Sequence, residues 1–231
     1  MNGPKSVPRL ALFDIDGTLL NEPSSEKRFM LWLFLKGHIG PIRLLAYALF
    51  ALCYFLRYGL AVFAKNKSLL WRRTVRSMET LAREWAADGL EKALYGPCLE
   101  RLRVHQQGGD IVVLLSGTPN VLADAIAERL GVDNVVATQC AVRAGRYSFA
   151  PPSLHRVGEA KLASARELCV RFETTLADTT AYGNSRSDLP LLGACGISVA
   201  VNPDSALAAI AREKGWEVIG SPTRGRARAS T

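Results

Sequence analysis

The strongest constraint in this sequence is an apolar segment that ends in two carboxylates. Residues 10–13 are all apolar, as in a buried β-strand, and Asp14, Ile15, Asp16 and Gly17 follow at once. Side chains two positions apart on an extended backbone point the same way, so Asp14 and Asp16 are predicted to share one pocket. Neighbouring carboxylates repel each other unless a cation, a proton or a basic group joins them. The segment predicts a metal or shared-proton site, or else a turn that merely uses Asp and Gly.

Strand-like and helix-like segments alternate along the rest of the chain. The further predicted strands are Ile111–Leu115, Val135–Cys140, Thr179–Gly183, Ile197–Val201 and Trp216–Ile219, and helical spacing lies between most of them. A short hairpin is predicted within 141–149. Strands that alternate with helices indicate an α/β fold with a mostly parallel sheet and right-handed crossovers.

The strand that ends at Leu115 is followed by Ser116, Gly117, Thr118 and Pro119, and helical spacing then resumes. With Pro119 in the first turn of a helix, the free backbone N–H groups and the helix dipole would attract an anion here. A capped helix without a ligand is the alternative.

Other polar side chains follow the ends of predicted strands. The segment 184–188 supplies a second cluster of oxygen ligands, and Lys161 lies early in a helix that runs to about Phe172. A lone helical lysine is usually solvated, so Lys161 matters only if the fold turns it inward. The carboxyl ends of parallel strands meet at one edge of the sheet. Asp14, Asp16, Ser116, Asn184 and Asp188 are therefore expected to converge.

Size and cysteine content set broad limits. The 231 residues, 48% hydrophobic and 22% charged, are sufficient for one domain with an insertion or for two small domains. The five cysteines are scattered without a close pair, which favours reduced thiols over disulfides or zinc. The first nine residues lack the apolar core of a signal peptide, so a cytoplasmic location is expected.

The net charge of +8 is concentrated in one segment. Between Lys27 and Arg76 there are ten Lys or Arg and no Asp or Glu, and apolar residues dominate 29–64. The longest uncharged run of this segment, 44–56, is shorter than the roughly 20 residues of a bilayer span, although tolerance of Arg57 would extend it to Ala64. Basic apolar helices suit an anionic membrane surface. The alternative is a packed helical unit with solvated arginines.

Four motifs together resemble those of the haloacid dehalogenase superfamily, specifically subfamily IB, the phosphoserine-phosphatase-like branch. Residues 14–19 are similar to its first motif, 115–118 to its second, Lys161 to its third and 183–188 to its fourth. The motifs occur in the family's order and cover nearly the whole chain outside the basic segment. The first motif is specific, whereas the lysine is not.

The resemblance implies roles for the site residues. Asp14 would attack phosphorus to form an aspartyl phosphate, and Asp16 would protonate the leaving oxygen and then activate water. Within this superfamily, a carboxyl group at the position of Asp16 favours hydrolysis of phosphate esters over cleavage of carbon–halogen bonds. Ser116, the N–H of Gly117 and Lys161 would hold the phosphoryl oxygens.

The resemblance also implies a cofactor, Mg²⁺, bound by an oxygen of Asp14, the backbone carbonyl of Asp16 and ligands from the fourth motif, Asn184 and Asp188. Asn184 stands where the commonest family pattern has an aspartate. An amide oxygen can still ligate Mg²⁺, but one negative charge is lost. Metal affinity is expected to fall unless Asp188 compensates directly or through water.

The implied architecture is a Rossmann-like three-layer core with an inserted all-helical cap of the C1 type. The core would comprise residues 1–20 and 95–222, and the cap would comprise residues 21–94. The basic segment 223–231 would be a disordered tail. The tail has neither interleaved aromatic residues nor a recognised motif, which argues against nucleic acid as a partner.

The sequence thus predicts an enzyme, a Mg²⁺-dependent phosphomonoester hydrolase. Its first candidate substrate is an anionic lipid or lipid-like phosphate, because the cap is apolar and basic. One alternative substrate is a small soluble metabolite such as phosphoserine. A further alternative is a non-catalytic binding module with the same fold, because of Asn184. A peripheral position at the cytoplasmic face of a membrane follows from the first candidate, and the oligomeric state is not predicted.

Overall fold

Strand β1 (Leu10–Phe13) lies at the centre of a six-stranded sheet in the computed structural model, which describes residues 9–222. The strand order is β3-β2-β1-β6-β7-β8, and each neighbouring pair is parallel. The other strands are β2 (Ile111–Pro119), β3 (Asn134–Thr138), β6 (Thr179–Gly183), β7 (Ile197–Val201) and β8 (Glu217–Ile219). All four residues of β1 are buried, as a central parallel strand requires. The predicted mostly parallel sheet is confirmed.

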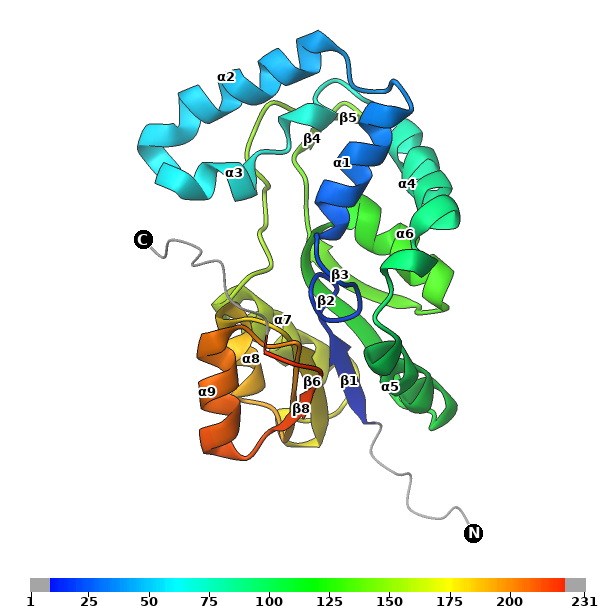
Figure 1. Ribbon diagram of the computed structural model, residues 1–231, viewed down its shortest axis with the longest axis vertical. Helices are drawn as coiled ribbons and strands as arrows, with labels where there is room; N and C mark the ends of the chain where they lie inside the picture. The colour runs from blue at the N-terminus through cyan, green and yellow to red at the C-terminus, as the bar shows by residue number, and fades with distance from the viewer. Residues whose placement is uncertain (1–8, 223–231) are drawn as a thin grey trace.

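Helices cover both faces of the sheet (Figure 1). Helices α5 (Gly96–Gln107) and α6 (Asn120–Leu130) lie on one face, and α7 (Glu159–Arg171), α8 (Leu189–Leu192) and α9 (Ser205–Lys214) on the other. Side chains alternate along β1, so Phe13 joins the core shared with α5 and α6. Leu12 joins the core shared with α7, α8 and α9. The predicted three-layer α/β fold is confirmed.

Four helices form a cap beyond the carboxyl ends of the strands (Figure 1). They are α1 (Ser25–Leu35), α2 (Pro41–Tyr58), α3 (Val62–Lys65) and α4 (Val75–Gly89), with short 3₁₀ turns between some of them. The chain leaves and re-enters the core side by side, because Leu20 and Leu94 form a β-bridge. Asn21 N donates to Ala93 O at 2.8 Å. The chain therefore passes between the core and the cap at residues 20–21 and 93–94.

Helix α4 begins at Val75, because the Thr74 hydroxyl accepts a hydrogen bond from Ser77 N at 3.1 Å and caps its start. One local expectation differs from the structure. Pro119 was expected in the first turn of the following helix. It is instead extended and precedes α6, which begins at Asn120. The segments 1–8 and 223–231, including the expected tail, lie outside the described residues.

The predicted hairpin is present as β4 (Val142–Arg143) and β5 (Arg146–Tyr147). It lies beside the cap although its sequence position is within 95–222, the segment assigned to the core (Figure 1). Tyr147 O accepts from Arg72 N and Tyr147 N donates to Arg73 O, both at 2.9 Å. The cap therefore rests on a second segment of the chain.

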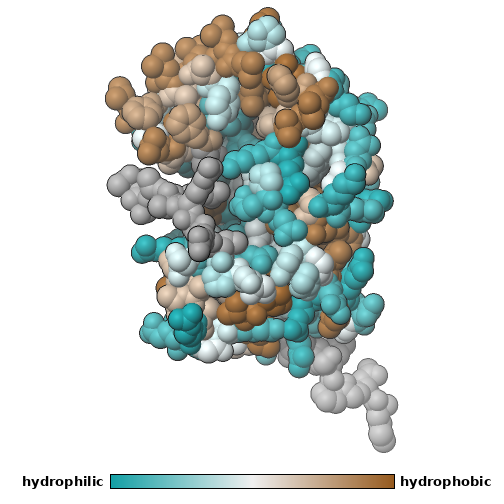
Figure 2. Space-filling view, viewed as in Figure 1, coloured by the Kyte–Doolittle hydropathy of each residue, from teal (hydrophilic) through white to brown (hydrophobic). Residues whose placement is uncertain are grey.

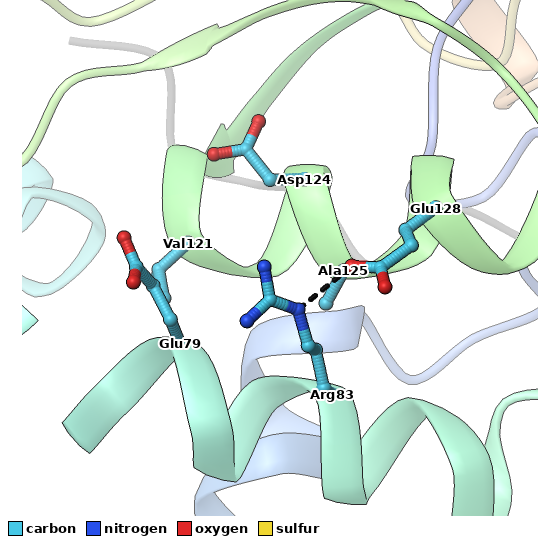
Figure 3. A pocket seen from close by; sticks show the side chains of 6 residues that line it. All are labelled: Glu79, Arg83, Val121, Asp124, Ala125 and Glu128. Carbon is cyan, nitrogen blue, oxygen red and sulfur yellow. Dashed lines mark hydrogen bonds and ion pairs between the residues drawn. The ribbon is translucent and has the colours of Figure 1, made fainter. Parts of the chain in front are cut away.

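The cap also contacts the core through α4 and α6. Figure 3 shows a pocket between these helices, lined by Glu79, Arg83, Val121, Asp124, Ala125 and Glu128. Arg83 Nε donates to Glu128 Oε2 at 2.7 Å, and more than half of each side chain is exposed. Exposed ion pairs contribute little to stability. None of the predicted site residues lines this pocket.

A buried ion pair inside the cap leads to a stability prediction. Lys67 is only 6% exposed, and its Nζ bonds both carboxylate oxygens of Glu26, at 2.7 and 2.6 Å. We expect Lys67→Met to lower the free energy of unfolding by about 3 kcal/mol, because it leaves the Glu26 carboxylate without its counter-ion. Adding Glu26→Gln should restore most of the loss. Urea denaturation of both single variants and the double variant measures the coupling energy between Lys67 and Glu26. Purely additive losses of stability would contradict a favourable ion pair.

Candidate active site

Three charged side chains meet at the carboxyl edge of the sheet. Asp14 follows β1, Asp188 follows β6, and Lys161 lies in the first turn of α7. Lys161 Nζ is 2.9 Å from Asp14 Oδ1 and 2.6 Å from Asp188 Oδ1. The three residues are 9% (Asp14), 3% (Lys161) and 1% (Asp188) exposed. Lys161, a weak candidate in the sequence, is thus turned inward and joins two carboxylates.

Burial dominates the electrostatics of this cluster. It raises the pKa of Asp14 to about 6, with the Lys161 ammonium opposing the rise and the Asp188 carboxylate adding to it. Burial alone would lower the pKa of Lys161, but the two carboxylates outweigh it and hold that pKa above its ordinary value. Lys161 therefore keeps its positive charge at neutral pH. The pKa of Asp14, about 6, lies just below neutral pH.

Asp16 is held by hydrogen bonds from two different parts of the chain. Its Oδ1 accepts from the backbone N–H of Ser25 at 2.6 Å, at the first residue of α1. Its Oδ2 accepts from the Thr118 hydroxyl at 3.0 Å. The first bond comes from the cap and the second from the end of β2. One of the two hydrogen bonds that orient the Asp16 carboxyl group therefore depends on the position of the cap.

The end of β2 supplies hydroxyl groups next to both aspartates. The Ser116 hydroxyl lies close enough to Asp14 to lower the pKa of that carboxyl group, and it lies 3.1 Å from the Thr118 hydroxyl. Ser116 and Thr118 are 2% and 3% exposed. Gly117 lies between them under the chain that leads to α7, and a Cβ at this position would come within 2.9 Å of Val157 Cγ2. A larger residue here would therefore require the Val157 side chain to move.

The loop after β6 wraps around Asp188. Asp188 Oδ2 accepts from Asn184 N at 3.2 Å and from both the N–H and the hydroxyl of Ser185 at 3.1 Å. With Oδ1 bonded to Lys161, both oxygens of Asp188 are used within the protein. The Asn184 side chain lies against Gly17, where a Cβ would overlap its Nδ2. Gly17 also has φ +82°, a conformation that favours glycine.

All the side chains predicted from the sequence therefore adjoin one edge of the sheet, linked by the contacts above. Thr118 and Ser25 are not among the site residues predicted from the sequence. Thr118 follows Ser116 with the same two-residue spacing as Asp14 and Asp16, which is a signal that was available. Ser25 acts through its backbone, and its contact depends on where the cap sits.

The residues expected to bind metal do not form an all-acidic cluster. Within 9–222, no group of three or more His, Cys, Asp or Glu side chains is arranged to hold a metal ion. The expected set includes a backbone carbonyl, that of Asp16, and an amide, that of Asn184. Such a donor set contains fewer carboxylates than an ordinary acidic metal site.

Comparison with known proteins places the chain in a family. A model of the haloacid dehalogenase-like hydrolases matches residues 11–193. A phosphoserine phosphatase of Mycobacterium tuberculosis is 30% identical over 224 residues, which cover 93% of this chain and 71% of that protein. A histidinol-phosphatase of Neisseria meningitidis is 29% identical over 230 residues, with 92% and 99% coverage. The chain spans about half the length of another relative, from Mycobacterium leprae, of which 49% is matched.

A solved structure agrees over the whole fold. A protein of unknown function from Bordetella pertussis Tohama I superposes with a TM-score of 0.78 and 26% identity, covering 93% of this chain and 99% of that one. The relatives named phosphatases support the predicted enzyme class. By its family match and its relatives, this chain belongs to the haloacid dehalogenase-like hydrolases, in their phosphoserine-phosphatase-like branch.

Proposed function

We propose that this protein is a Mg²⁺-dependent phosphomonoester hydrolase that works through an aspartyl phosphate on Asp14. The observation that carries the proposal is the cluster in which Lys161 joins Asp14 to Asp188, with hydroxyl groups of β2 alongside. A buried carboxylate beside a fixed cation is suited to attack a phosphoryl group whose negative charge the cation offsets. The phosphatase relatives are consistent with this chemistry.

Asp14 is the carboxylate available for attack. Asp188 is less exposed and both its oxygens are bonded within the protein, whereas Lys161 contacts Oδ1 of Asp14. In the first step an Asp14 oxygen bonds to phosphorus as the bond from phosphorus to the leaving oxygen breaks. In the second step water attacks phosphorus, the bond to Asp14 breaks, and phosphate leaves.

Asp16 transfers the protons of both steps. Its carboxyl group donates a proton to the leaving oxygen in the first step and takes one from the attacking water in the second. The hydrogen bonds from Ser25 N and the Thr118 hydroxyl fix its orientation. Because Ser25 begins α1, the cap contributes directly to the orientation of the acid–base group.

Charge that spreads over the phosphoryl oxygens is balanced by fixed donors. Lys161 supplies a positive charge that Asp188 holds in place at 2.6 Å. Ser116 and the backbone of Gly117 lie at the end of β2, on the same side as Asp14. Donors that are already oriented cost no reorganisation when the charge develops.

The donor set fits Mg²⁺ by its chemistry. Asp14 offers a carboxylate, Asp16 a backbone carbonyl and Asn184 an amide, and Mg²⁺ prefers such hard oxygen ligands. The Asn184 side chain lies against Gly17, next in sequence to Asp16, which keeps it near the other two donors. When bound, Mg²⁺ would neutralise charge on the carboxylate and the phosphoryl group. The bonds of Asp188 to Lys161 and the 184–185 loop favour a supporting role for it over direct ligation, contrary to the wider set expected from the sequence.

This ligand set predicts that Asn184→Asp tightens Mg²⁺ binding about 10-fold, because a second carboxylate joins the ligands. The Mg²⁺ dependence of hydrolysis and the Mg²⁺-induced shift of Tm both measure this effect. Asn134→Asp, at the opposite end of the sheet, adds the same charge and should change neither. An unaltered Mg²⁺ affinity in the Asn184 variant would show that this residue is not a ligand.

Two substrate classes remain, and each has a supporting observation. The first candidate is an anionic lipid or lipid-like phosphate, supported by the basic, apolar character of the cap. The second is a small soluble metabolite, supported by relatives named phosphoserine phosphatase and histidinol-phosphatase. Cap residues adjoin the site through Ser25, so the cap is placed to contact the leaving group.

A substrate panel distinguishes the two classes. Phosphate release is compared for lysophosphatidate, phosphatidylglycerophosphate, phosphoserine and histidinol phosphate, each with Mg²⁺. Higher kcat/KM for a lipid supports the first candidate. Equal or higher kcat/KM for phosphoserine or histidinol phosphate rejects it.

The activity itself is tested with a generic aryl phosphate and Mg²⁺. If the wild type hydrolyses the aryl phosphate and a variant without Asp14 does not, the result supports an enzyme that depends on Asp14. Hydrolysis that persists in the variant rejects the role of Asp14. A protein that hydrolyses neither the aryl phosphate nor any member of the panel would be a non-catalytic binding module with this fold.

A further inference from the structure

The outward face of α2 is strongly apolar. Leu45, Leu49, Leu52 and Leu56 recur at intervals of four, three and four residues, so they form one stripe along the helix. Their exposed fractions are 69%, 48%, 75% and 99%. A helix on the surface of a water-soluble protein normally has its polar residues on this side. We call this stripe the α2 face.

Neighbouring segments extend the α2 face into a larger apolar surface. Figure 2 shows the hydrophobic colour concentrated at the α2 end of the molecule. Further large apolar side chains exposed in this part of the chain are Leu31, Phe34, Leu35, Ile42, Leu44, Phe55, Leu60 and Phe63. Contiguous apolar surface of this kind normally marks an interaction site.

The opposite side of α2 is fixed to the protein. Ala46 and Phe50 are buried, and Phe50 packs edge-on against Phe149 at 5.5 Å between ring centres. Arg43 Nη1 donates to Leu69 O at 3.1 Å and to Trp71 O at 2.9 Å. The helix is therefore held along its side, and its apolar residues face outward because the inward positions are already filled.

This attachment decides how α2 would meet a bilayer. The segment Pro41–Ala61 is long and apolar enough to span one, and only 11% of its most apolar window is buried. A spanning helix would have to leave its contacts with the rest of the cap. Lying across the end of the molecule, as Figure 1 shows, α2 instead presents its whole length to a flat surface.

Cations stacked on aromatic rings border the apolar surface. Arg57 and Lys65 lie over the ring of Tyr58, at 5.2 and 5.3 Å from its centre. Arg72 lies over Trp71 at 5.6 Å. Aromatic rings and basic side chains are enriched where proteins meet the polar layer of a membrane. The sequence has no acidic residue in 27–76 to oppose attraction to anionic headgroups.

We propose that the α2 face is a docking surface for an anionic membrane, with the helix lying in the plane of the interface. A second copy of this chain is the other occupant of comparable shape. Two such surfaces would bring together the bordering cations of each chain, Arg57, Lys65 and Arg72, with no acidic residue in 27–76 to pair with them. The charge therefore favours an anionic lipid surface. The proposal concerns binding and is independent of the catalytic mechanism.

Vesicle flotation with the full-length chain tests the proposal. We expect the protein to float with vesicles of phosphatidylglycerol and phosphatidylcholine, and much less with phosphatidylcholine alone or at high salt. The variant Leu45→Gln/Leu52→Gln should bind anionic vesicles about 100-fold more weakly, because the interface loses two leucine side chains that contact with the membrane would bury. Both leucines are more than two-thirds exposed, so the fold should tolerate the change, and circular dichroism melting checks it.

The matched control is Val170→Gln, on α7, whose side chain is 82% exposed and distant in sequence from the cap. It should float like the wild type. Absence of wild-type flotation with anionic vesicles at low salt would overturn the proposal, as would equal flotation of the double variant. A concentration-dependent dimer that the double variant disrupts, without any flotation, would assign the surface to a second copy and also overturn it.

A fluorescence measurement tests the depth of contact. Cys53 is exposed on α2, so an environment-sensitive label can be attached there in a Cys195→Ser background. We expect the emission to shift to the blue when anionic vesicles are added, because the label enters an apolar layer. An unchanged spectrum on vesicle-bound protein would contradict insertion of α2.

Discussion

Replacement of Asp14 by asparagine is expected to lower kcat for aryl phosphate hydrolysis by about 10⁴-fold or more, because the variant has no carboxylate to attack phosphorus. The variant should still fold. Lys161 keeps its 2.6 Å contact with Asp188, so the removal of one carboxylate leaves that buried cation paired. The loss is therefore expected in kcat, with little change in Tm, and both are measured on the same preparation.

Asp133→Asn is the matched control for this experiment. Asp133 is exposed in the turn between α6 and β3, and its replacement should leave kcat and Tm unchanged. Retention of more than a tenth of the wild-type kcat by the Asp14 variant would exclude Asp14 as the nucleophile.

Lys161→Met is expected to affect both stability and activity. The ammonium group of Lys161 is the shared counter-ion of two buried carboxylates, and its removal leaves both uncompensated. The free energy of unfolding should fall by about 3 to 5 kcal/mol at pH 8. Hydrolysis should fall as well, because the positive charge next to the phosphoryl group is lost.

The pH dependence gives this prediction a distinctive signature in metal-free buffer. The pKa of Asp14 is raised from 3.8 to about 6 in the fold, so the folded state binds this proton more tightly than the unfolded state. Stability from this group is therefore present at low pH and is lost as the pH rises from about 4 to 6. Without Lys161 the pKa of Asp14 rises further, and the loss continues above pH 6. The difference between variant and wild type should be smaller at pH 5 than at pH 8.

Urea denaturation at pH 5 and pH 8 measures this difference. Arg166→Met removes an exposed cation from the same helix and should cost little at either pH. A Lys161→Met effect that is equal at both pH values would contradict the assignment of Lys161 as the counter-ion of Asp14.

The core and its candidate site were largely predictable from the sequence because both depend on short periodicities. The buried strand 10–13 and the strand-end polar residues follow from alternation and from the geometry of a parallel sheet. Strands β6 and β7 begin and end at the predicted residues. Once the sheet is parallel, Asp14, Ser116 and Asp188 must lie at one edge.

Contacts between distant segments were not predictable in the same way. The bond from Ser25 N to Asp16 depends on the position of the cap, and the pairing of Tyr147 with residues 72 and 73 depends on the path of the hairpin. The sequence predicts Asp188 as a metal ligand but does not predict the bonds of its oxygens to Lys161 and to the loop after β6. Sequence spacing places a carboxylate near a site, but the choice among its neighbours is made by packing.

The exposed face of α2 was also only half predictable. An apolar stripe at helical spacing usually packs into a core, and the sequence alone left packing and membrane contact as alternatives. In the structure Ala46 and Phe50 fill the inward side, and the leucines of the α2 face point away. The composition of α2 shows that the helix is apolar on two sides. The contacts of Arg43 and Phe50 determine which of the two sides is covered by the rest of the protein.

The covalent intermediate on Asp14 is the central claim, and chemical trapping tests it most directly. The enzyme is mixed with an aryl phosphate and Mg²⁺, quenched in borohydride, digested and analysed by mass spectrometry. An acyl phosphate at Asp14 is reduced to homoserine at that position, whereas an unmodified carboxylate is not. The proposed mechanism predicts homoserine at position 14 in the wild type and none at Asp16 or Asp188. Multiple turnovers with no reduction product at position 14, or with the product at another aspartate, would contradict it.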